Sequence, residues 1–231
     1  MTNSEILNKI KGGLIVSCQA LPTEPLYDSY IMSKMAYAAS LGGAVGIRAN
    51  TVVDIKAIKE KVDLPVIGII KAEYNDSEVY ITPTMKEVDD LVDAGCEIIA
   101  LDATKRLRPG GISFTDFFKE VREKYPNQLF MADTSCFEEG KLALELGMDL
   151  LGTTMSSYTP YTKGTPLPDY PLMKKYVDLG ATVIAEGGIW SPEQLTKAFD
   201  CGVHAAVVGT AITRPMDITK RFVKALEEHK K

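Results

Sequence analysis

The sequence predicts an α/β protein and, within that class, a (β/α)8 TIM barrel. Its 231 residues are 45% hydrophobic and 25% charged, which is enough for one large core. About eight short apolar runs occur along the chain, each followed by a stretch with helical spacing, and eight such units close a barrel. An open doubly wound sheet is the alternative, but no G-x-G-x-x-G follows the first run. We therefore expect a single barrel domain over residues 1–231, with a short N-terminal helix.

The eight runs have the composition of buried parallel strands. Because they are apolar on both faces, we expect cover on both sides, which alternating helices provide. Ahead of the first run, Ile6, Leu7 and Ile10 have the spacing of an amphipathic helix, and the charges among them are unlike a signal peptide. In chain order the runs are GLIVSCQ, GAVGIRA, PVIGIIKA, EIIALDAT, QLFMADT, LLGTTMS, TVIAEGG and AAVVGTA.

The helices between these runs carry start and stop signals. Ser191 is a good N-cap, Pro192 fits the first turn, and Gln194 is placed to complete a capping box. Gly202 can adopt the left-handed conformation that ends the helix before the next strand. The same signals occur earlier at Thr84, Glu87 and Gly95.

Composition excludes several classes of function. A net charge of -5 and a pI near 5.2 argue against a nucleic-acid partner, because such proteins need a basic face. No apolar run is long enough to span a membrane. The cysteines are widely spaced and only two histidines accompany them, so we expect reduced thiols, a cytoplasmic location and no metal site. These cysteines are Cys18, Cys96, Cys136 and Cys201.

In a (β/α)8 barrel the chemistry lies where the strands end, so the polar residues that follow each apolar run are the candidate site. Two loops on this side, 72–82 and 156–169, are longer than a barrel needs, and either is a candidate lid. Among the polar residues, Asp102 with Arg106 and Arg108 is typical of an ion-pair cluster at the rim. The full set is Gln19, Arg48, Lys71, Asp102, Asp133, Thr153, Thr154, Glu186 and Thr210.

Lys71 and Glu186 are the candidate acid and base. The run PVIGIIK ends on Lys71, which is its only charged residue. Burial of an amine lowers its pKa, and an amine that is neutral for this reason can act as a base. Glu186 ends the seventh strand, half a turn around the barrel from the third, so the two side chains face each other. The alternatives are a lysine that reaches water or pairs with a carboxylate, and a glutamate bonded to backbone N–H groups.

The last two loops predict an anion site. Gly187 and Gly188, which have no side chains, form a turn just before a predicted helix, and Gly209 with Thr210 forms a second turn of this kind. In such turns the backbone N–H groups can approach a phosphate closely. Arg214 is near enough to add positive charge, although it could instead cap a helix. Glycine in a tight turn is the alternative explanation.

Three further strand-end residues, Gln19, Arg48 and Asp133, have the groups to orient a hydroxyl or carbonyl of a substrate, unless Arg48 and Asp133 pair with other charges of the rim. Neither His204, at the start of the eighth strand, nor His229, in the charged C-terminal segment, is placed for catalysis. Together these residues predict proton transfer, without a cofactor, on a small phosphorylated substrate.

Eight segments spread over nearly the whole chain resemble the N-acylglucosamine-6-phosphate 2-epimerase family. They are GGLIVSCQALPTEPL, GAVGIRAN, PVIGIIK, ALDATKRLRP, MADTS, LLGTTMSSYT, VIAEGGIWSPEQ and VVGTAITRP. The resemblance implies a cofactor-free isomerase of sialic acid breakdown that converts N-acetylmannosamine 6-phosphate to N-acetylglucosamine 6-phosphate on a barrel, as a homodimer. It also implies Lys71 and Glu186 as the acid/base pair, with Arg48 and Asp133 as substrate ligands.

Two other functions remain open at this point. A Schiff-base aldolase would use Lys71 as a nucleophile toward a keto sugar phosphate. A non-catalytic sugar-phosphate binding protein would use the mouth of the barrel as its binding pocket.

Overall fold

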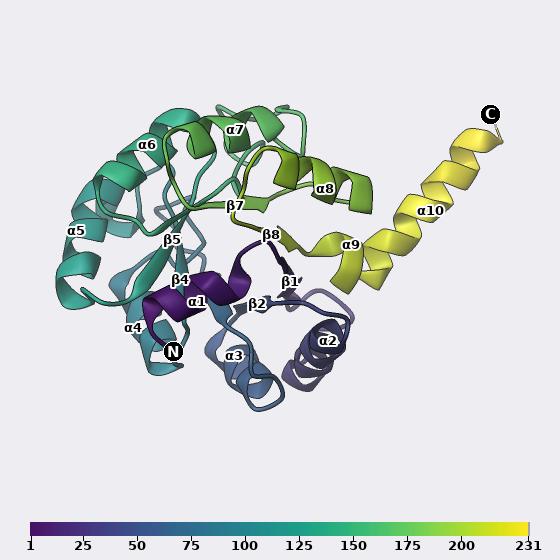
Figure 1. The fold of residues 1–231 in the computed structure, drawn as a ribbon, viewed down its shortest axis with the longest axis horizontal. Coiled ribbons are helices and arrows are strands. Elements are labelled where there is room, and N and C mark those ends of the chain that lie inside the picture. The colour runs from purple at the N-terminus through teal and green to yellow at the C-terminus, as the bar shows by residue number, and fades with distance from the viewer. Residues whose placement is uncertain (231) are drawn as a thin grey trace.

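The computed structural model, which describes residues 1–230, is a closed barrel of eight parallel strands joined by helices, as predicted (Figure 1). Each strand pairs with the next in sequence, and β1 pairs with β8 to close the ring. The strands are β1 (Leu14–Cys18), β2 (Gly46–Asn50), β3 (Val66–Ile69), β4 (Ile98–Asp102), β5 (Leu129–Asp133), β6 (Leu150–Gly152), β7 (Val183–Glu186) and β8 (Ala205–Val208).

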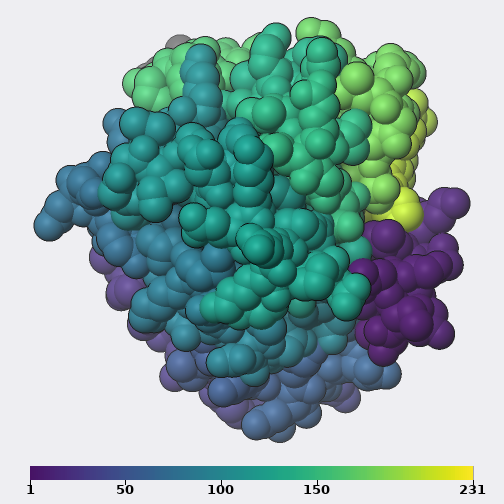
Figure 2. Space-filling view, turned by 90° about the vertical axis from the view of Figure 1, so that its left-hand side faces the viewer, coloured from purple at the N-terminus to yellow at the C-terminus, as the bar shows by residue number. Residues whose placement is uncertain are grey.

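Helices surround this barrel on its outer face, except that the first closes one end of it and the last projects away from it (Figure 1). In order they are α1 (Asn3–Ile10), α2 (Ser29–Leu41), α3 (Val52–Lys59), α4 (Met85–Asp93), a 3-10 turn η1 (Pro109–Gly111), α5 (Phe114–Lys124), α6 (Phe137–Glu145), α7 (Tyr170–Asp178), α8 (Pro192–Asp200), α9 (Thr210–Thr213) and α10 (Pro215–His229). Figure 2 shows one flank, where α4, α5 and α6 (teal) form a continuous surface with the purple N-terminal segment beside them.

The two-residue period of the strands divides the core into two layers. Outward side chains pack on the helices, whereas inward ones fill the barrel with α1 residues at its base. Nε2 of His204 donates to the carbonyl of Leu7 at 2.9 Å, so His204 lies at this base and away from the carboxyl ends of the strands, as predicted. The inward cluster includes Ile6, Ile10, Ile15, Ile67, Ile69, Ile98, Leu129, Met131, Leu150, Ile184 and Val207.

Most of the predicted helix signals are confirmed. Ser191 Oγ accepts the N–H of Gln194 at 3.3 Å, and Gly202 has a φ of 89°. The capping box at Gln194 differs from the prediction, because its side-chain oxygen accepts the N–H of Trp190 at 2.7 Å, one residue before the N-cap. Either arrangement satisfies a backbone donor at the start of α8.

The predicted ion pair forms, but the cluster does not lie on an exposed rim. Asp102 and Arg106 pair at 2.6 Å, whereas Asp102 and Arg108 are each only 1% exposed. The guanidinium of Arg108 donates to the carbonyls of Thr82 and Pro83, both at 2.9 Å, and to the carbonyl of Asp102. It also lies 4.0 Å from the ring of Phe117. Arg108 therefore fastens the end of the loop after β3 to β4, because three carbonyl oxygens there have a buried partner.

Replacing Arg108 by Met should lower the free energy of unfolding by about 2–3 kcal/mol, because it leaves these buried carbonyl oxygens without donors. Urea unfolding measures the loss. Lys86→Ala is the matched control, since Lys86 is 74% exposed in a surface ion pair with Asp90 and should change stability by less than about 0.5 kcal/mol. Equal stability of the Arg108→Met protein and the wild type would contradict this role.

The C-terminal helix α10 leaves the barrel and extends into solvent (Figure 1). None of its residues is buried, and its apolar side chains Met216, Phe222, Val223 and Leu226 are all exposed. Among residues 1–230, no helix has the length and apolar character to cross a membrane.

Candidate active site

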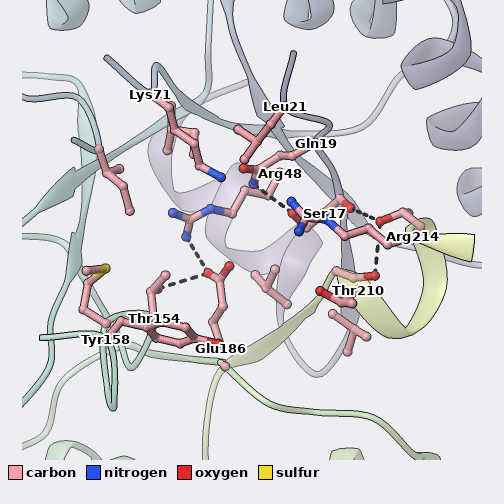
Figure 3. A pocket seen from close by; sticks show the side chains of 18 of the residues that line it. Ser17, Gln19, Leu21, Arg48, Lys71, Thr154, Tyr158, Glu186, Thr210 and Arg214 are labelled. Carbon is pink, nitrogen blue, oxygen red and sulfur yellow. Dashed lines mark hydrogen bonds and ion pairs between the residues drawn. The ribbon is translucent and has the colours of Figure 1, made fainter. Parts of the chain in front are cut away.

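A cavity of about 780 Å³ opens at the carboxyl ends of the strands. Because every second side chain of a strand points into the barrel, the residue two positions after an inward apolar residue also points inward. Lys71 follows Ile69 in this way, and Glu186 follows Ile184. Figure 3 shows the side chains of Lys71, Arg48 and Glu186 converging in this cavity. Of the strand-end candidates, Asp102, Asp133 and Thr153 do not line it. The predicted residues that line it are Gln19, Arg48, Lys71, Thr154, Glu186, Gly187, Gly188, Gly209, Thr210 and Arg214.

The amine of Lys71 lies in the cavity with no hydrogen-bond or ion-pair partner within residues 1–230. The backbone beside it is fixed, because the N–H of Lys71 donates to Oδ1 of Asn50 at 2.9 Å. Burial lowers the pKa of Lys71 to about 8, with further lowering by the positive charges of Arg214 and Arg48 and opposition from Glu186. A substantial fraction of the amine is therefore neutral near physiological pH, as a base requires.

Glu186 reaches the cavity from the opposite wall. Its Oε2 accepts from Arg48 Nη1 and lies 3.1 Å from the hydroxyl of Thr154. Burial raises the pKa of Glu186 to about 7; Arg48 opposes this, and Asp133 adds to it. Because its pKa lies near neutrality, this carboxyl group can both take up and release a proton at physiological pH.

Arg48 connects two carboxylates. Its Nη2 donates to Oδ2 of Asp133 at 2.5 Å, its Nη1 to Oδ1 at 3.1 Å, and Nη1 also contacts Glu186. Burial lowers its pKa, but Asp133 and Glu186 more than offset this and raise the pKa above the ordinary value, so the guanidinium stays charged. Its Nε is buried and has no hydrogen-bond partner within the described residues.

Asp133 is placed differently from the prediction. It is 0% exposed and is not among the residues that line the cavity. Both carboxylate oxygens are occupied, by Arg48 and by the hydroxyl of Thr154 at 2.6 Å. The geometry therefore favours Asp133 as support for Arg48 instead of a direct substrate ligand.

The glycine turns lie at the β7 and β8 side of the cavity, as expected. Gly187 and Gly188 have φ values of 112° and 70°, which favour glycine strongly. Gly188 has a second reason to lack a side chain, because an added Cβ would lie 2.4 Å from Cβ of Leu167 in the loop before α7. Gly209 has no such positive φ, but its Cβ would approach Cβ of Ser17 to 3.2 Å.

Arg214 is at the same end of the cavity and pairs with Glu24 at 3.2 Å. Part of its charge is therefore already balanced by a protein carboxylate. An anion that enters between the two glycine turns would compete with Glu24 for this guanidinium.

Several cavity residues escaped sequence reasoning. Ser17 accepts from Gln19 Nε2 at 2.8 Å and could have been found as the polar residue inside an apolar run. Thr154 was visible as a strand-end residue, but its partners were not. The others come from loops whose paths a single sequence does not reveal; they include Tyr80, Tyr158 and Trp190. Among residues 1–230, no group of three or more His, Cys, Asp or Glu side chains is arranged to hold a metal ion.

Comparisons with known proteins agree with this geometry. Residues 32–228 match the NanE family, described as "Putative N-acetylmannosamine-6-phosphate epimerase". Two curated relatives are named "Putative N-acetylmannosamine-6-phosphate 2-epimerase". One, from Caldanaerobacter subterraneus subsp. tengcongensis, is 52% identical over 98% of this chain and 96% of its own length. The other, from Clostridioides difficile, is 55% identical over 96% of this chain and 99% of its own.

Solved structures give the same result. The N-acetylmannosamine-6-phosphate 2-epimerase from Clostridium perfringens superposes with a TM-score of 0.90 at 54% identity, covering 95% of both chains. A thiamine phosphate pyrophosphorylase from Pyrococcus furiosus, at 18% identity and a TM-score of 0.61, shares the fold alone. The match over most of the sequence and the agreement in structure place this chain in the NanE family of N-acetylmannosamine-6-phosphate epimerases.

Proposed function

We propose that this protein epimerises carbon 2 of N-acetylmannosamine 6-phosphate to give N-acetylglucosamine 6-phosphate, in the breakdown of sialic acid. The observation that carries the proposal is one cavity in which an amine with a lowered pKa, Lys71, faces a carboxyl group with a raised pKa, Glu186. The relatives' names supply the substrate, and the two glycine turns offer its phosphate a place at one end of the cavity.

The chemistry of the substrate explains why two proton-transfer groups are needed. The hydrogen on carbon 2 becomes acidic only when carbon 1 is an aldehyde, so the sugar ring must open first. In our proposal Glu186 takes the proton of the 1-hydroxyl while the bond from carbon 1 to the ring oxygen breaks, and the ring oxygen takes a proton from water. Neutral Lys71 then removes the carbon 2 proton. Protonated Glu186 then returns a proton to the other face of carbon 2, which gives the epimer, and the Lys71 ammonium replaces the proton that water gave to the ring oxygen.

Arg48 has the geometry to stabilise the intermediate. Loss of the carbon 2 proton moves negative charge onto the oxygen of carbon 1, and a buried guanidinium fixed by Asp133 needs little rearrangement to meet it. Gln19, Gly187, Gly188, Gly209, Thr210 and Arg214 are proposed to hold the rest of the substrate and its phosphate. Binding of the phosphate then helps to position carbon 2.

The product identifies the reaction. Incubation of the protein with N-acetylmannosamine 6-phosphate, followed by proton NMR, should show N-acetylglucosamine 6-phosphate and no smaller fragments. Cleavage of a carbon–carbon bond, together with borohydride trapping of substrate on Lys71, would instead establish an aldolase. Tight binding without conversion would establish a sugar-phosphate binding protein.

The rate should depend on pH in a defined direction. Lys71, with a pKa of about 8, is neutral and active above that pH, and Glu186, with a pKa of about 7, is ionised above 7. The value of kcat/KM should therefore rise by about tenfold per pH unit between 7 and 8, more steeply below 7, and level off near pH 9. Initial rates between pH 5.5 and 9.5 measure it. A rate that falls between pH 6 and 9 would contradict these protonation states.

We also propose a homodimer in which α10 packs on the second subunit. Helical spacing places Met216, Phe222, Val223 and Leu226 on one face, and Figure 1 shows that this helix projects away from its own barrel. An exposed apolar face of this kind is typical of a subunit interface. The cytoplasmic location stays a prediction, which the four free cysteines support.

The double substitution of Phe222 and Leu226 by Glu should convert the dimer to a monomer, because it places two charges on the proposed contact face. Analytical ultracentrifugation measures the change. Lys224→Glu is the control, since Lys224 is 75% exposed and lies on the opposite face of α10. A wild-type monomer, or a double variant that stays dimeric, would disprove the proposed interface.

A further inference from the structure

Two consecutive threonines follow β6, and both contact Glu186. Thr153 holds its backbone: the hydroxyl donates to the carbonyl of Glu186 at 2.8 Å and accepts its N–H at 3.1 Å. Thr154 holds its side chain: the hydroxyl oxygen lies 2.6 Å from Oδ1 of Asp133 and 3.1 Å from Oε2 of Glu186. Figure 3 shows Thr154 directly beside Glu186 at the cavity wall.

The two carboxyl oxygens of Glu186 therefore have different surroundings. Oε2 is contacted by Arg48 Nη1 and by the Thr154 hydroxyl. Oε1 has no hydrogen-bond partner in the described part of the chain, residues 1–230. The side chain is 15% exposed and lines the cavity. One oxygen is held by the protein, and the other is open to a ligand.

Space for the Thr154 hydroxyl comes from a glycine two residues earlier. A Cβ at Gly152 would lie 3.0 Å from Oγ1 of Thr154 and 2.4 Å from Cε of Met131. The hydroxyl therefore occupies a position that a larger residue in β6 would disturb. Its two carboxylate neighbours come from the strands β5 and β7, and because the hydroxyl has a single hydrogen, it donates to one of them at a time, Asp133 at 2.6 Å or Glu186 at 3.1 Å.

We propose that Thr154 is a positioning residue which, with Arg48, reserves Oε2 of Glu186 for the protein, so that Oε1 is the oxygen that exchanges a proton with the sugar. The inference rests on the proposed epimerase function, which it deepens. During ring opening the 1-hydroxyl proton moves to Oε1, the bond from carbon 1 to the ring oxygen breaks, and the ring oxygen takes a proton from water. That water regains a proton from the Lys71 ammonium after carbon 2 has been deprotonated. Oε2 keeps its two protein contacts throughout.

The effect of Thr154 on Glu186 can be separated from the effects of the charged groups around Glu186. Arg48 on β2, Lys71 after β3 and Asp133 on β5 are the charged groups that face Glu186. Thr154→Val preserves the shape of the side chain and all three charges, but removes the hydroxyl. Whenever the Thr154 hydroxyl donates to Glu186 instead of Asp133, it stabilises the charged form of Glu186 and lowers the pKa of that carboxyl, so its removal makes Glu186 bind a proton more tightly. The variant should therefore need a higher pH to ionise Glu186.

The test compares kcat/KM against pH for the wild type, Thr154→Val and Thr154→Ser, with thermal unfolding of each protein. For Thr154→Val, the low-pH part of the kcat/KM curve (its acidic limb) should shift to higher pH by about one unit. The value of kcat/KM should therefore fall about tenfold below pH 7 and change little at pH 9. Thr154→Ser keeps a hydroxyl in the same place, so its acidic limb should match that of the wild type.

Three results would overturn the proposal: an acidic limb in Thr154→Val that matches the wild type, an equal loss at every pH, or a Thr154→Ser variant as impaired as Thr154→Val. The second of these is what loss of packing alone would produce. If Thr154→Val does not fold, Thr154→Ala replaces it with the same expected shift. A wild-type protein that does not convert the substrate would refute the proposed function itself. An active wild type whose pH dependence is unchanged in the Thr154→Val variant would refute only this inference.

Discussion

Lys71→Ala should lower kcat by about 10³-fold or more, which is the largest loss expected from a single substitution in this protein. Removal of a positioned general base typically costs 10²–10⁴-fold, and Lys71 is proposed to act directly on carbon 2. The substitution should leave the fold intact, because the amine has no partner within residues 1–230 and the Asn50 contact is to the backbone N–H. The rate of conversion, followed by proton NMR, measures the effect.

Lys71→Arg is the matched variant for charge. Arginine stays protonated at all relevant pH values, so it should be nearly as inactive as alanine although it keeps the positive charge. Lys86→Ala, on the surface, should retain wild-type activity. Full turnover by the Lys71→Ala protein would rule out Lys71 as the base.

Arg48→Met should damage both stability and catalysis. It leaves Asp133 fully buried without its cation and removes the guanidinium beside Glu186. Breaking a buried ion pair in this way costs about 3–5 kcal/mol of unfolding free energy. Loss of the proposed oxyanion donor should lower kcat by a further factor of about 10²–10³. Urea unfolding and initial rates measure the two effects separately.

A second substitution separates the two roles of Arg48. In the double variant Arg48→Met with Asp133→Asn, the unpaired buried carboxylate is gone, so part of the stability should return. The rate should stay low, because neither replacement supplies a positive charge near carbon 1. If activity returned together with stability, Arg48 would serve only to hold the structure.

The barrel itself could be predicted because its strands are mainly apolar on both faces. Arg48 in β2 and Asp133 in β5 are exceptions, but the run PVIGIIK indicates where β3 lies, and its single charge follows two residues after the end of the strand. The same rule identified Glu186 at the end of β7. Because closed barrels place strands three and seven on opposite walls, the meeting of Lys71 and Glu186 in one cavity followed from order alone.

Contacts that depend on register were beyond the sequence. Ser17 lies beside Arg48 because β1 and β2 pair with that offset, and a shift by one residue would reverse every side chain. The depth of Asp133 below the cavity and its contact with Thr154 have the same origin. Arg108 shows a different limit: its charge pattern favoured a surface cluster, whereas tertiary packing buried it against Phe117.

The path of α10 could not be predicted for another reason. Its amphipathic pattern is that of a helix that packs on its own barrel, and nothing in the sequence indicates that the helix projects away from it. Residues from the long loops, such as Tyr80 and Tyr158, reach the cavity along paths set by packing with the rest of the rim. Local patterns specify elements, whereas these placements depend on contacts distant in sequence.

Incorporation of solvent deuterium at carbon 2 tests the central claim most directly. With the wild-type protein and N-acetylmannosamine 6-phosphate in heavy water, NMR should show deuterium at carbon 2 of the product and at no other carbon, and the Lys71→Ala protein should show none over the same period. Formation of product that retains its original hydrogen at carbon 2 in wild-type reactions, despite full epimerisation, would contradict proton exchange between that carbon and the solvent-accessible groups of this cavity.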